Sequence, residues 1–271
     1  MIVPASDLPI EQYHASAPAW LSKTTLRYFA DNGAPWFKLF LDGQVKPSTP
    51  GGVEQGAALD CLLTENGADF DARFAIKPKG HDGRTKEGKA WVEANSGKKL
   101  LTENDMAILA DAAAAVRACS AWPRITKSMA QATVRRQAPA LGLGLQSRPD
   151  WLLPSEGCVF DLKKTSELRR FGAQSIDLGY HLQAAVAGWC LAGDGVALEH
   201  AYLVAVEWER GARCRIYEIP HEVLEHADTQ MREIAAEIGE RLASGNWTDH
   251  QEQVEPLPVP GWMLRQMEAV G

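Results

Sequence analysis

The chain has 271 residues, of which 45% are hydrophobic and 23% charged, so it can bury a full core. No apolar run approaches the roughly 20 residues of a membrane helix, and residues 1–10 lack the basic-then-apolar order of a signal peptide. We therefore expect a cytoplasmic protein with no membrane partner. Its five cysteines are widely spaced, which argues against disulfides and against a zinc site.

The net charge of −7 argues against nucleic-acid binding, because Lys and Arg supply most of the affinity for phosphates. The charge is unevenly distributed, however. Segment 194–255 carries 14 acidic and 5 basic residues, which leaves the rest of the chain at +2. Segment 77–99 holds seven Lys or Arg against three acids. Such a run is either a solvated face or a binding surface for nucleic acid.

The first part of the chain, about 1–120, is expected to be helical. Ser22 predicts the start of a helix that runs to about Phe29, and the Gly33-Ala34-Pro35 break separates it from an amphipathic stretch at 36–41. The next helix is expected from about Gly52 to Glu65.

Segment 66–99 is glycine-rich and basic, and we expect irregular structure that arches over a substrate groove. Four basic residues of this segment are expected to bind nucleic acid, namely Lys79, Arg84, Lys86 and Lys89. Thr102 then caps an alanine-rich helix.

Two short apolar stretches, 145–153 and 158–162, flank a turn-forming Pro-Ser-Glu-Gly sequence and predict a β-hairpin. Each arm carries one carboxylate, Asp150 and Asp161. Side chains alternate along a strand, so Lys163 is expected on the same face as Asp161.

Two carboxylates on adjacent strands form a hard oxygen site for Mg²⁺, which Mn²⁺ can replace. Burying Asp161 without a metal or a cation would cost several kcal/mol. The residue types therefore predict metal-assisted attack of water on a phosphodiester, with Lys163 orienting the water or stabilising the charge on the phosphate. The alternatives are that the aspartates are ordinary turn residues and that Lys163 is only their salt-bridge partner. Arg148 and Lys164 flank the site and are expected to contact nucleic acid, although Lys164 alternates to the opposite face.

The remaining elements are a helix at 175–191, a hairpin formed by 201–208 and 213–219, and a helix at 221–243. Strands interrupted by a helix and preceded by helices predict one α/β domain, 1–271, with a mixed sheet flanked by helices. The sheet core is expected at about 130–220, and 221–271 forms a C-terminal helix and tail.

The pairing of Pro149-Asp150 with Asp161-Leu162-Lys163 resembles the signature of the PD-(D/E)xK nucleases. With Gly56–Asp60 upstream and Gly179–Ala185 downstream, the order and spacing resemble the RecE-type (exonuclease VIII) DNA exonucleases of phage and prophage recombination systems. The resemblance spans most of the chain. It also includes Tyr13-His14, Leu21-Ser22-Lys23, Lys77-Pro78-Lys79-Gly80, Gly245-Asn246-Trp247 and Pro260-Gly261-Trp262.

This resemblance implies a restriction-endonuclease-like core and 5′-to-3′ exonuclease activity on double-stranded DNA with free ends. It implies that the main-chain carbonyl of Leu162 is a metal ligand and that Gln183 and Tyr180, one helical turn apart, contact the scissile phosphate. It further implies a ring-shaped homo-oligomer and a single-strand annealing protein as partner. The alternatives are an endonuclease or repair nuclease on the same fold, and a non-catalytic DNA-binding recombination protein with a decayed site.

Asp60 departs from that family, which usually carries histidine at the corresponding position. On the expected helix it shares a stripe with Val53, Gly56 and Leu63, a face that is otherwise small or apolar. A lone carboxylate there would be costly, so we expect Asp60 to be a third carboxylate ligand of the metal. The alternative is that it reaches solvent or a nearby basic side chain.

Overall fold

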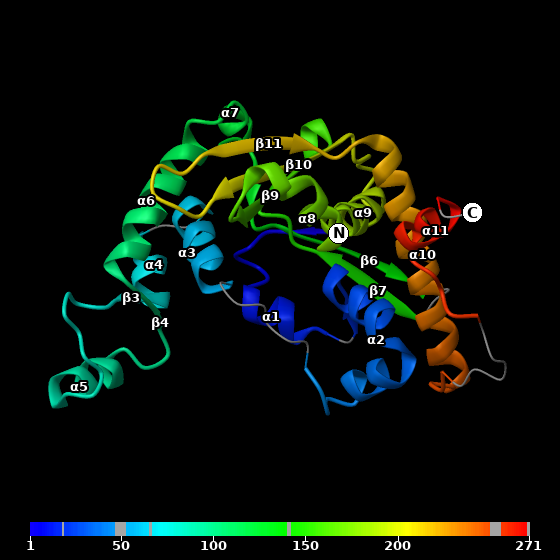
Figure 1. The fold of residues 1–271 in the computed structure, drawn as a ribbon, viewed down its shortest axis with the longest axis horizontal. Coiled ribbons are helices and arrows are strands. Elements are labelled where there is room, and N and C mark those ends of the chain that lie inside the picture. The colour runs from blue at the N-terminus through cyan, green and yellow to red at the C-terminus, as the bar shows by residue number, and fades with distance from the viewer. Residues whose placement is uncertain (18, 47–52, 65–66, 140–141, 250–255, 270–271) are drawn as a thin grey trace.

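The computed structural model describes residues 1–17, 19–46, 53–64, 67–139, 142–249 and 256–269. A mixed sheet with helices on both faces forms the centre of the fold (Figure 1). Its strands, in spatial order, are β11 (Cys214–Glu218), β10 (His200–Glu207), β9 (Cys158–Thr165), β8 (Trp151–Leu153) and β5 (Met129–Ala130). Only β9 and β10 run parallel within this sheet, and the other pairs are antiparallel. The expected mixed sheet flanked by helices is thus confirmed.

A second sheet continues from the first. Its spatial order is β1 (Ile2–Val3), β6 (Thr133–Ala138), β7 (Leu143–Ser147) and β2 (Trp20–Leu21). Ala130 faces Trp151 at the end of the first sheet, and Val134 faces Ser147 at the start of the second. The segments between these pairs, 131–133 and 148–150, have equal length. Strands β5 and β6 therefore pair with β8 and β7 in one register, with no residue inserted on either side of the gap. We call this paired stretch the long ladder.

The two faces of the central sheet are buried by different helices. Along β9, Val159 packs in the apolar cluster of α9 (Tyr180–Ala192) and α10 (His221–Ser244), whereas Phe160 packs in a second cluster on the opposite face. This second cluster includes residues of α3 (Val53–Thr64), α6 (Glu103–Arg117) and α7 (Trp122–Ile125). The alternation follows from the period of two along a strand, and burial of both faces is typical of sheets that contain parallel strands.

Several predicted elements are confirmed by their local signals. Helix α2 (Lys23–Leu41) starts after Ser22, whose N–H donates to Thr25 Oγ1 at 2.6 Å, and it is kinked at Gly33, where φ is 78°. Helix α6 starts after Thr102, whose Oγ1 accepts from the Asp105 N–H at 3.0 Å. The β10–β11 hairpin and α10 also form at the expected positions.

The expectation for segment 66–99 is wrong. It folds into α4 (Gly67–Arg73), β3 (Phe74–Ile76) and α5 (Lys86–Ala94), followed by β4 (Lys99–Leu101) parallel to β3. The side chain of Thr85 caps α5, while Phe74 and Leu101 are buried in the second apolar cluster. Gly80, Gly83 and Gly97 lie in the turns between these short elements, whereas Gly88 is buried within α5.

The helix expected at 175–191 is divided into α8 (Phe171–Asp177) and α9. Gly179 lies between them with φ 66°, a left-handed conformation that glycine adopts without steric cost. The division starts α9 at Tyr180, so that Tyr180 and Gln183 lie on its first turn.

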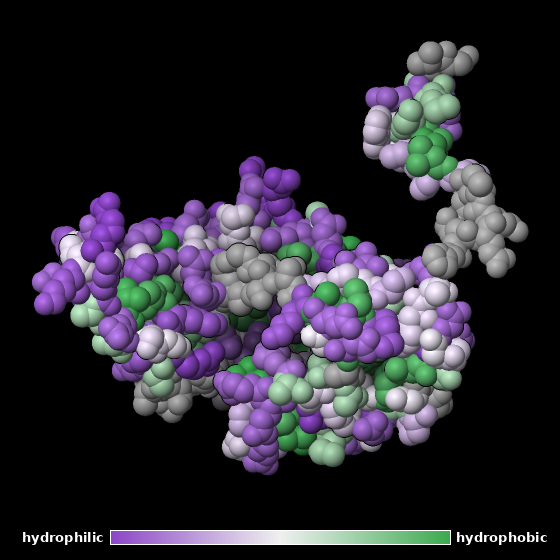
Figure 2. Space-filling view, turned by 90° about the horizontal axis from the view of Figure 1, so that it is seen from below, coloured by the Kyte–Doolittle hydropathy of each residue, from purple (hydrophilic) through white to green (hydrophobic). Residues whose placement is uncertain are grey.

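Two further helices are peripheral, α1 (Ile10–Ala15) and α11 (Gly261–Glu268). Helix α11 carries exposed apolar side chains, including Trp262 and Met267, and stands away from the body at the upper right of Figure 2. Among the described residues, none of the helices combines the length and the apolar character that a membrane crossing requires.

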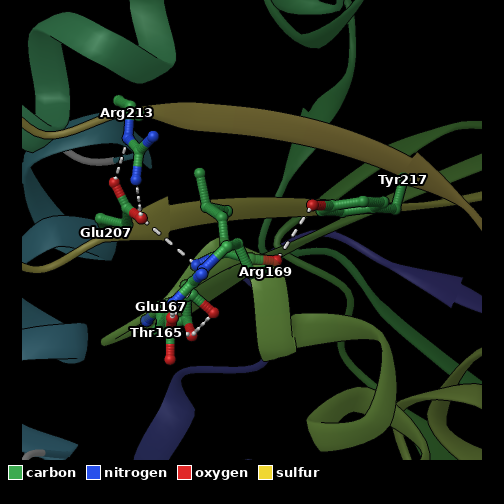
Figure 3. A network of polar contacts seen from close by, with 7 residues as sticks. Thr165, Glu167, Arg169, Glu207, Arg213 and Tyr217 are labelled. Carbon is green, nitrogen blue, oxygen red and sulfur yellow. Dashed lines mark hydrogen bonds and ion pairs between the residues drawn. The ribbon is translucent and has the colours of Figure 1, made fainter.

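A polar network fixes the turn that follows β9 (Figure 3). Glu207, at the end of β10, is 1% exposed and accepts hydrogen bonds from Arg213 Nε at 2.7 Å and from the Leu168 N–H at 3.3 Å. The bonds from Arg213 lower the pKa of the Glu207 carboxyl. Tyr217 donates to the Leu168 carbonyl at 3.4 Å, and Thr165 Oγ1 accepts from the Glu167 N–H at 3.2 Å. The end of the strand that carries Asp161 and Lys163 is thereby held on the sheet.

Candidate active site

Asp150 lies at the interruption of the long ladder, just before β8. Its Oδ2 accepts a hydrogen bond from the Leu162 N–H at 2.6 Å, which ties the carboxylate to the middle of β9. Its Oδ1 accepts from the side-chain amide of Gln131 at 2.9 Å, and its carbonyl accepts from the Gln131 N–H, also at 2.9 Å. The two hairpin arms therefore meet at Asp150, as the sequence predicts.

Asp161 and Lys163 project from the same face of β9. Asp161 is 7% exposed and the Lys163 side chain 14% exposed, and Lys163 Nζ lies 2.6 Å from Asp161 Oδ2. The salt bridge that the sequence left open as an alternative is thus formed. It does not exclude a catalytic role for Lys163, because the ammonium also lies at the face of α9, next to Gln183 and Tyr180.

Helix α9 presents Tyr180 and Gln183 to this ion pair. Lys163 Nζ lies 3.4 Å from Gln183 Oε1 and 4.7 Å from the centre of the Tyr180 ring. Asp161, Tyr180 and Gln183 line one narrow crevice with a volume of about 10 Å³, roughly the room that a single water molecule needs. The structure therefore brings together the carboxylate, the ammonium and the two α9 residues that were expected to act on one phosphate.

Asp60 reaches the site from α3. Its Oδ1 accepts from the Gln131 amide nitrogen at 2.8 Å, and the same nitrogen donates to Asp150. Asp60 and Asp150 therefore share one hydrogen-bond donor, the side-chain amide of Gln131.

The carboxylates repel one another electrostatically. Burial raises the pKa of Asp150 well above its usual range, and the negative charges of Asp60 and Asp161 raise it further, against Lys163 and the Leu162 N–H. Burial opposes the charge of Lys163, but the carboxylates of Asp161 and Asp150 outweigh it and raise the pKa of the ammonium. Bringing these carboxylates together therefore favours either a protonated Asp150 or a bound cation.

The donor set fits a divalent cation. In the described part of the chain, no three His, Cys, Asp or Glu side chains converge as a ready-made metal-binding group, and the Gln131 amide donates to both Asp60 and Asp150. The oxygens of Asp60, Asp150 and Asp161 are nevertheless the hard ligands that Mg²⁺ and Mn²⁺ prefer, and a bound cation would relieve the repulsion among these carboxylates. The main chain of Leu162 also lies here, since its N–H binds Asp150.

Two residues at the site were not assigned a role from the sequence. Lys23, at the start of α2, lies 5.5 Å from the centre of the Tyr180 ring, and burial together with the charge of Lys163 lowers its pKa to about 8. In the sequence, Lys23 stood out only as part of Leu21-Ser22-Lys23, one of the segments that resemble the RecE-type exonucleases. Gln131 had no signal in the sequence, because its place opposite Asp150 depends on the register of the long ladder.

The expected nucleic-acid contacts divide into two groups. Arg148 is turned inward, where its guanidinium donates to Gln131 Oε1 at 3.0 Å and to the Leu8 carbonyl at 2.7 Å. Lys164 is on the opposite face from Lys163, as expected, and donates to Gln55 Oε1 at 2.8 Å. Both side chains therefore form hydrogen bonds within the protein, Arg148 with Gln131 and Leu8 and Lys164 with Gln55.

The second group lies on and before α5. These residues, Lys79, Arg84, Lys86 and Lys89, are all exposed. Arg84 forms an ion pair with Asp82 at 3.0 Å. Figure 1 shows α5 at the left edge of the molecule, apart from β9 and α9. The structure thus places this group outside the carboxylate site.

A hairpin that carries Asp150 and the Asp161-Leu162-Lys163 triplet, in a mixed sheet covered by helices, defines the PD-(D/E)xK class of fold. The chain belongs to the family described as PDDEXK-like domain of unknown function (DUF3799), whose model matches residues 32–257. The expected PD-(D/E)xK fold is thereby confirmed.

A solved structure at low sequence identity agrees at the level of the fold. The crystal structure of a proposed exonuclease from Eubacterium rectale aligns with a TM-score of 0.62 at 14% identity, over 95% of this chain and 97% of that chain. A phage-related exonuclease from Haemophilus somnus 129PT covers 69% of this chain and 94% of its own at 12% identity, but its TM-score of 0.30 supports no argument. No curated protein is significantly similar to the chain.

Proposed function

We propose that this protein is a metal-dependent deoxyribonuclease that hydrolyses phosphodiester bonds of DNA. One observation carries the proposal. Asp150 and the Asp161–Lys163 ion pair lie on one hairpin of a PD-(D/E)xK fold, and Asp60 reaches the same place from α3. Three carboxylates with one ammonium form a site for a divalent cation and a phosphate, whereas a purely structural role would not require three carboxylates to be brought together.

The residues have distinct roles in this proposal. Asp60, Asp150 and Asp161, with the carbonyl of Leu162, would hold Mg²⁺, or Mn²⁺ in its place. When bound, such an ion lowers the pKa of water and polarises the phosphoryl oxygen. Lys163 orients the attacking water or stabilises charge on the phosphate, since its ammonium lies beside Asp161 at the crevice. Gln183 and Tyr180 contact the phosphate from α9.

The finer proposal is a 5′-to-3′ exonuclease that acts on ends of double-stranded DNA in phage-type recombination. It is supported by the order and spacing of the motifs along the chain and by the fold shared with a protein described as a proposed exonuclease. The same resemblance supports a ring-shaped homo-oligomer and a single-strand annealing protein as partner.

One assay tests the activity and its mode. Linear duplex and covalently closed circular duplex are incubated with the protein in Mg²⁺, in Mn²⁺ and in EDTA. We expect release of nucleotides from the linear duplex in either metal, early release of a 5′-terminal label, an intact circle, and no reaction in EDTA. Cleavage of the circle would instead indicate an endonuclease. DNA binding without release of nucleotides in any metal would indicate the non-catalytic alternative.

The exposed basic group of α5 gives a prediction about binding. Replacing Lys79, Arg84, Lys86 and Lys89 together with Gln should weaken DNA binding and flatten its dependence on salt, because fewer counterions are released. Fluorescence anisotropy with labelled duplex at several salt concentrations measures the slope. Replacing Arg232 and Arg265 with Gln provides a control, since both are exposed and lie on α10 and α11, on the opposite side of Figure 1 from α5. An unchanged slope would place the α5 group on a merely solvated surface.

A further inference from the structure

Gln131 has no assigned role in the chemistry, yet it forms hydrogen bonds with Asp60, Asp150 and Arg148. It is 9% exposed and lies in the interruption of the long ladder, directly opposite Asp150. Its amide nitrogen donates to Asp60 Oδ1 at 2.8 Å and to Asp150 Oδ1 at 2.9 Å. A primary amide has two N–H donors, so each donor serves one carboxylate.

The backbone of Gln131 is held in an uncommon conformation. Its φ is 52°, and it is the only non-glycine residue with a positive φ in the part of the chain that the structure describes. Such a conformation persists only where the surroundings determine it, and it often marks a functional site. Here the Gln131 N–H donates to the Asp150 carbonyl at 2.9 Å, and Arg148 Nε donates to Gln131 Oε1 at 3.0 Å.

Arg148 is in turn fixed from outside the ladder. Its Nη1 donates to the Leu8 carbonyl at 2.7 Å and to Thr133 Oγ1 at 3.3 Å. Because the guanidinium donates to the amide oxygen of Gln131, it fixes the orientation of the side-chain amide. The NH₂ group is then turned toward Asp60 and Asp150. The neutral NH₂ group of Gln131 therefore occupies the two carboxylate oxygens, one of Asp60 and one of Asp150, that a cation bound between them would need as ligands.

We propose that the Gln131 amide is an internal substitute for the cation. It is a positioning residue that holds Asp60 and Asp150 together in the metal-free protein, and its NH₂ group leaves their oxygens when a divalent ion binds. This inference rests on the proposed metal-dependent function. It follows that the two charge-assisted hydrogen bonds oppose metal binding and that Gln131 sets the affinity of the site for the ion.

The test is Mn²⁺ binding by isothermal titration calorimetry without DNA, together with thermal unfolding in EDTA. In Gln131→Ala the carboxylates lose their shared donor, so Tm in EDTA should fall. The competitor of the ion is also lost, so the Kd for Mn²⁺ should tighten roughly tenfold or more. Gln131→Gly removes the amide and relieves the positive φ, so it should tighten Mn²⁺ binding equally with a smaller fall in Tm.

The matched control is Gln137→Ala, because Gln137 is an exposed glutamine on the same strand, β6. It should change neither Tm nor the Kd for Mn²⁺. If the wild type binds Mn²⁺ and both Gln131 variants bind it no more tightly, the amide is a fixed structural support and the inference is overturned. If the wild type binds no Mn²⁺, or if Asp150→Ala binds it as well as the wild type, the proposed metal site itself fails.

Discussion

Asp161→Ala is expected to lower the rate of DNA hydrolysis about a thousandfold, at about 1.4 kcal/mol of transition-state stabilisation per tenfold in rate. The substitution removes a proposed metal ligand and also the ion-pair partner of Lys163, whose ammonium lies 2.6 Å from the carboxylate. Asp150→Ala should have an effect of the same order, because the Leu162 N–H loses its acceptor as well. Release of acid-soluble nucleotides from linear duplex in Mg²⁺ measures both rates.

Asp177→Ala is a matched control for these variants, since Asp177 is an exposed aspartate at the end of α8. It should retain full activity. DNA binding, measured by fluorescence anisotropy in EDTA, should survive in all three variants, because the carboxylates contribute no positive charge to it. Near-native hydrolysis by either site variant in Mg²⁺ would show that the carboxylate is not a metal ligand.

The second large effect concerns Asp60. Asp60→Ala should be severely impaired, while Asp60→His should keep substantial activity with Mn²⁺, which accepts nitrogen ligands more readily than Mg²⁺ does. The structure supports the importance of this position, because Asp60 shares the Gln131 donor with Asp150 and raises the pKa of Asp150. The measurement is the ratio of hydrolysis rates in Mn²⁺ and Mg²⁺ for each variant.

Glu54→Ala is the control on the same helix, since Glu54 is exposed on the first turn of α3. Its activity and its metal preference should equal those of the wild type. A fully active Asp60→Ala protein would show that Asp60 is not a metal ligand and would favour the alternative that its carboxylate reaches solvent or a nearby basic side chain.

The parts of the fold that the sequence predicted correctly have local causes. The kink at Gly33, the cap at Thr102 and the turn before Cys158 each depend on residues within a few positions along the chain. Segment 66–99 was predicted wrongly because its strands are short and their stability comes from distant packing. Phe74 and Leu101 are buried against α3 and α6, which no local pattern shows.

The same distinction applies to the site. The alternation along β9 placed Asp161 and Lys163 on one face, and the hairpin turn brought Asp150 near them. The shared donor at Gln131 was not predicted, because it requires the register of β5–β6 against β7–β8 and a positive φ. The inward orientation of Arg148 was missed for a similar reason, since its partner Leu8 is remote in sequence.

The equal lengths of 131–133 and 148–150 also restrict how this family of sequences can vary. One residue added to either segment would slip the ladder by one position and turn every side chain beyond it to the opposite face. A neighbouring residue would then lie beside Leu162 in place of Asp150. The apolar side chains of both sheets would no longer face the core. Length variation should therefore accumulate at the hairpin tips, while the lengths of 131–133 and 148–150 change only together.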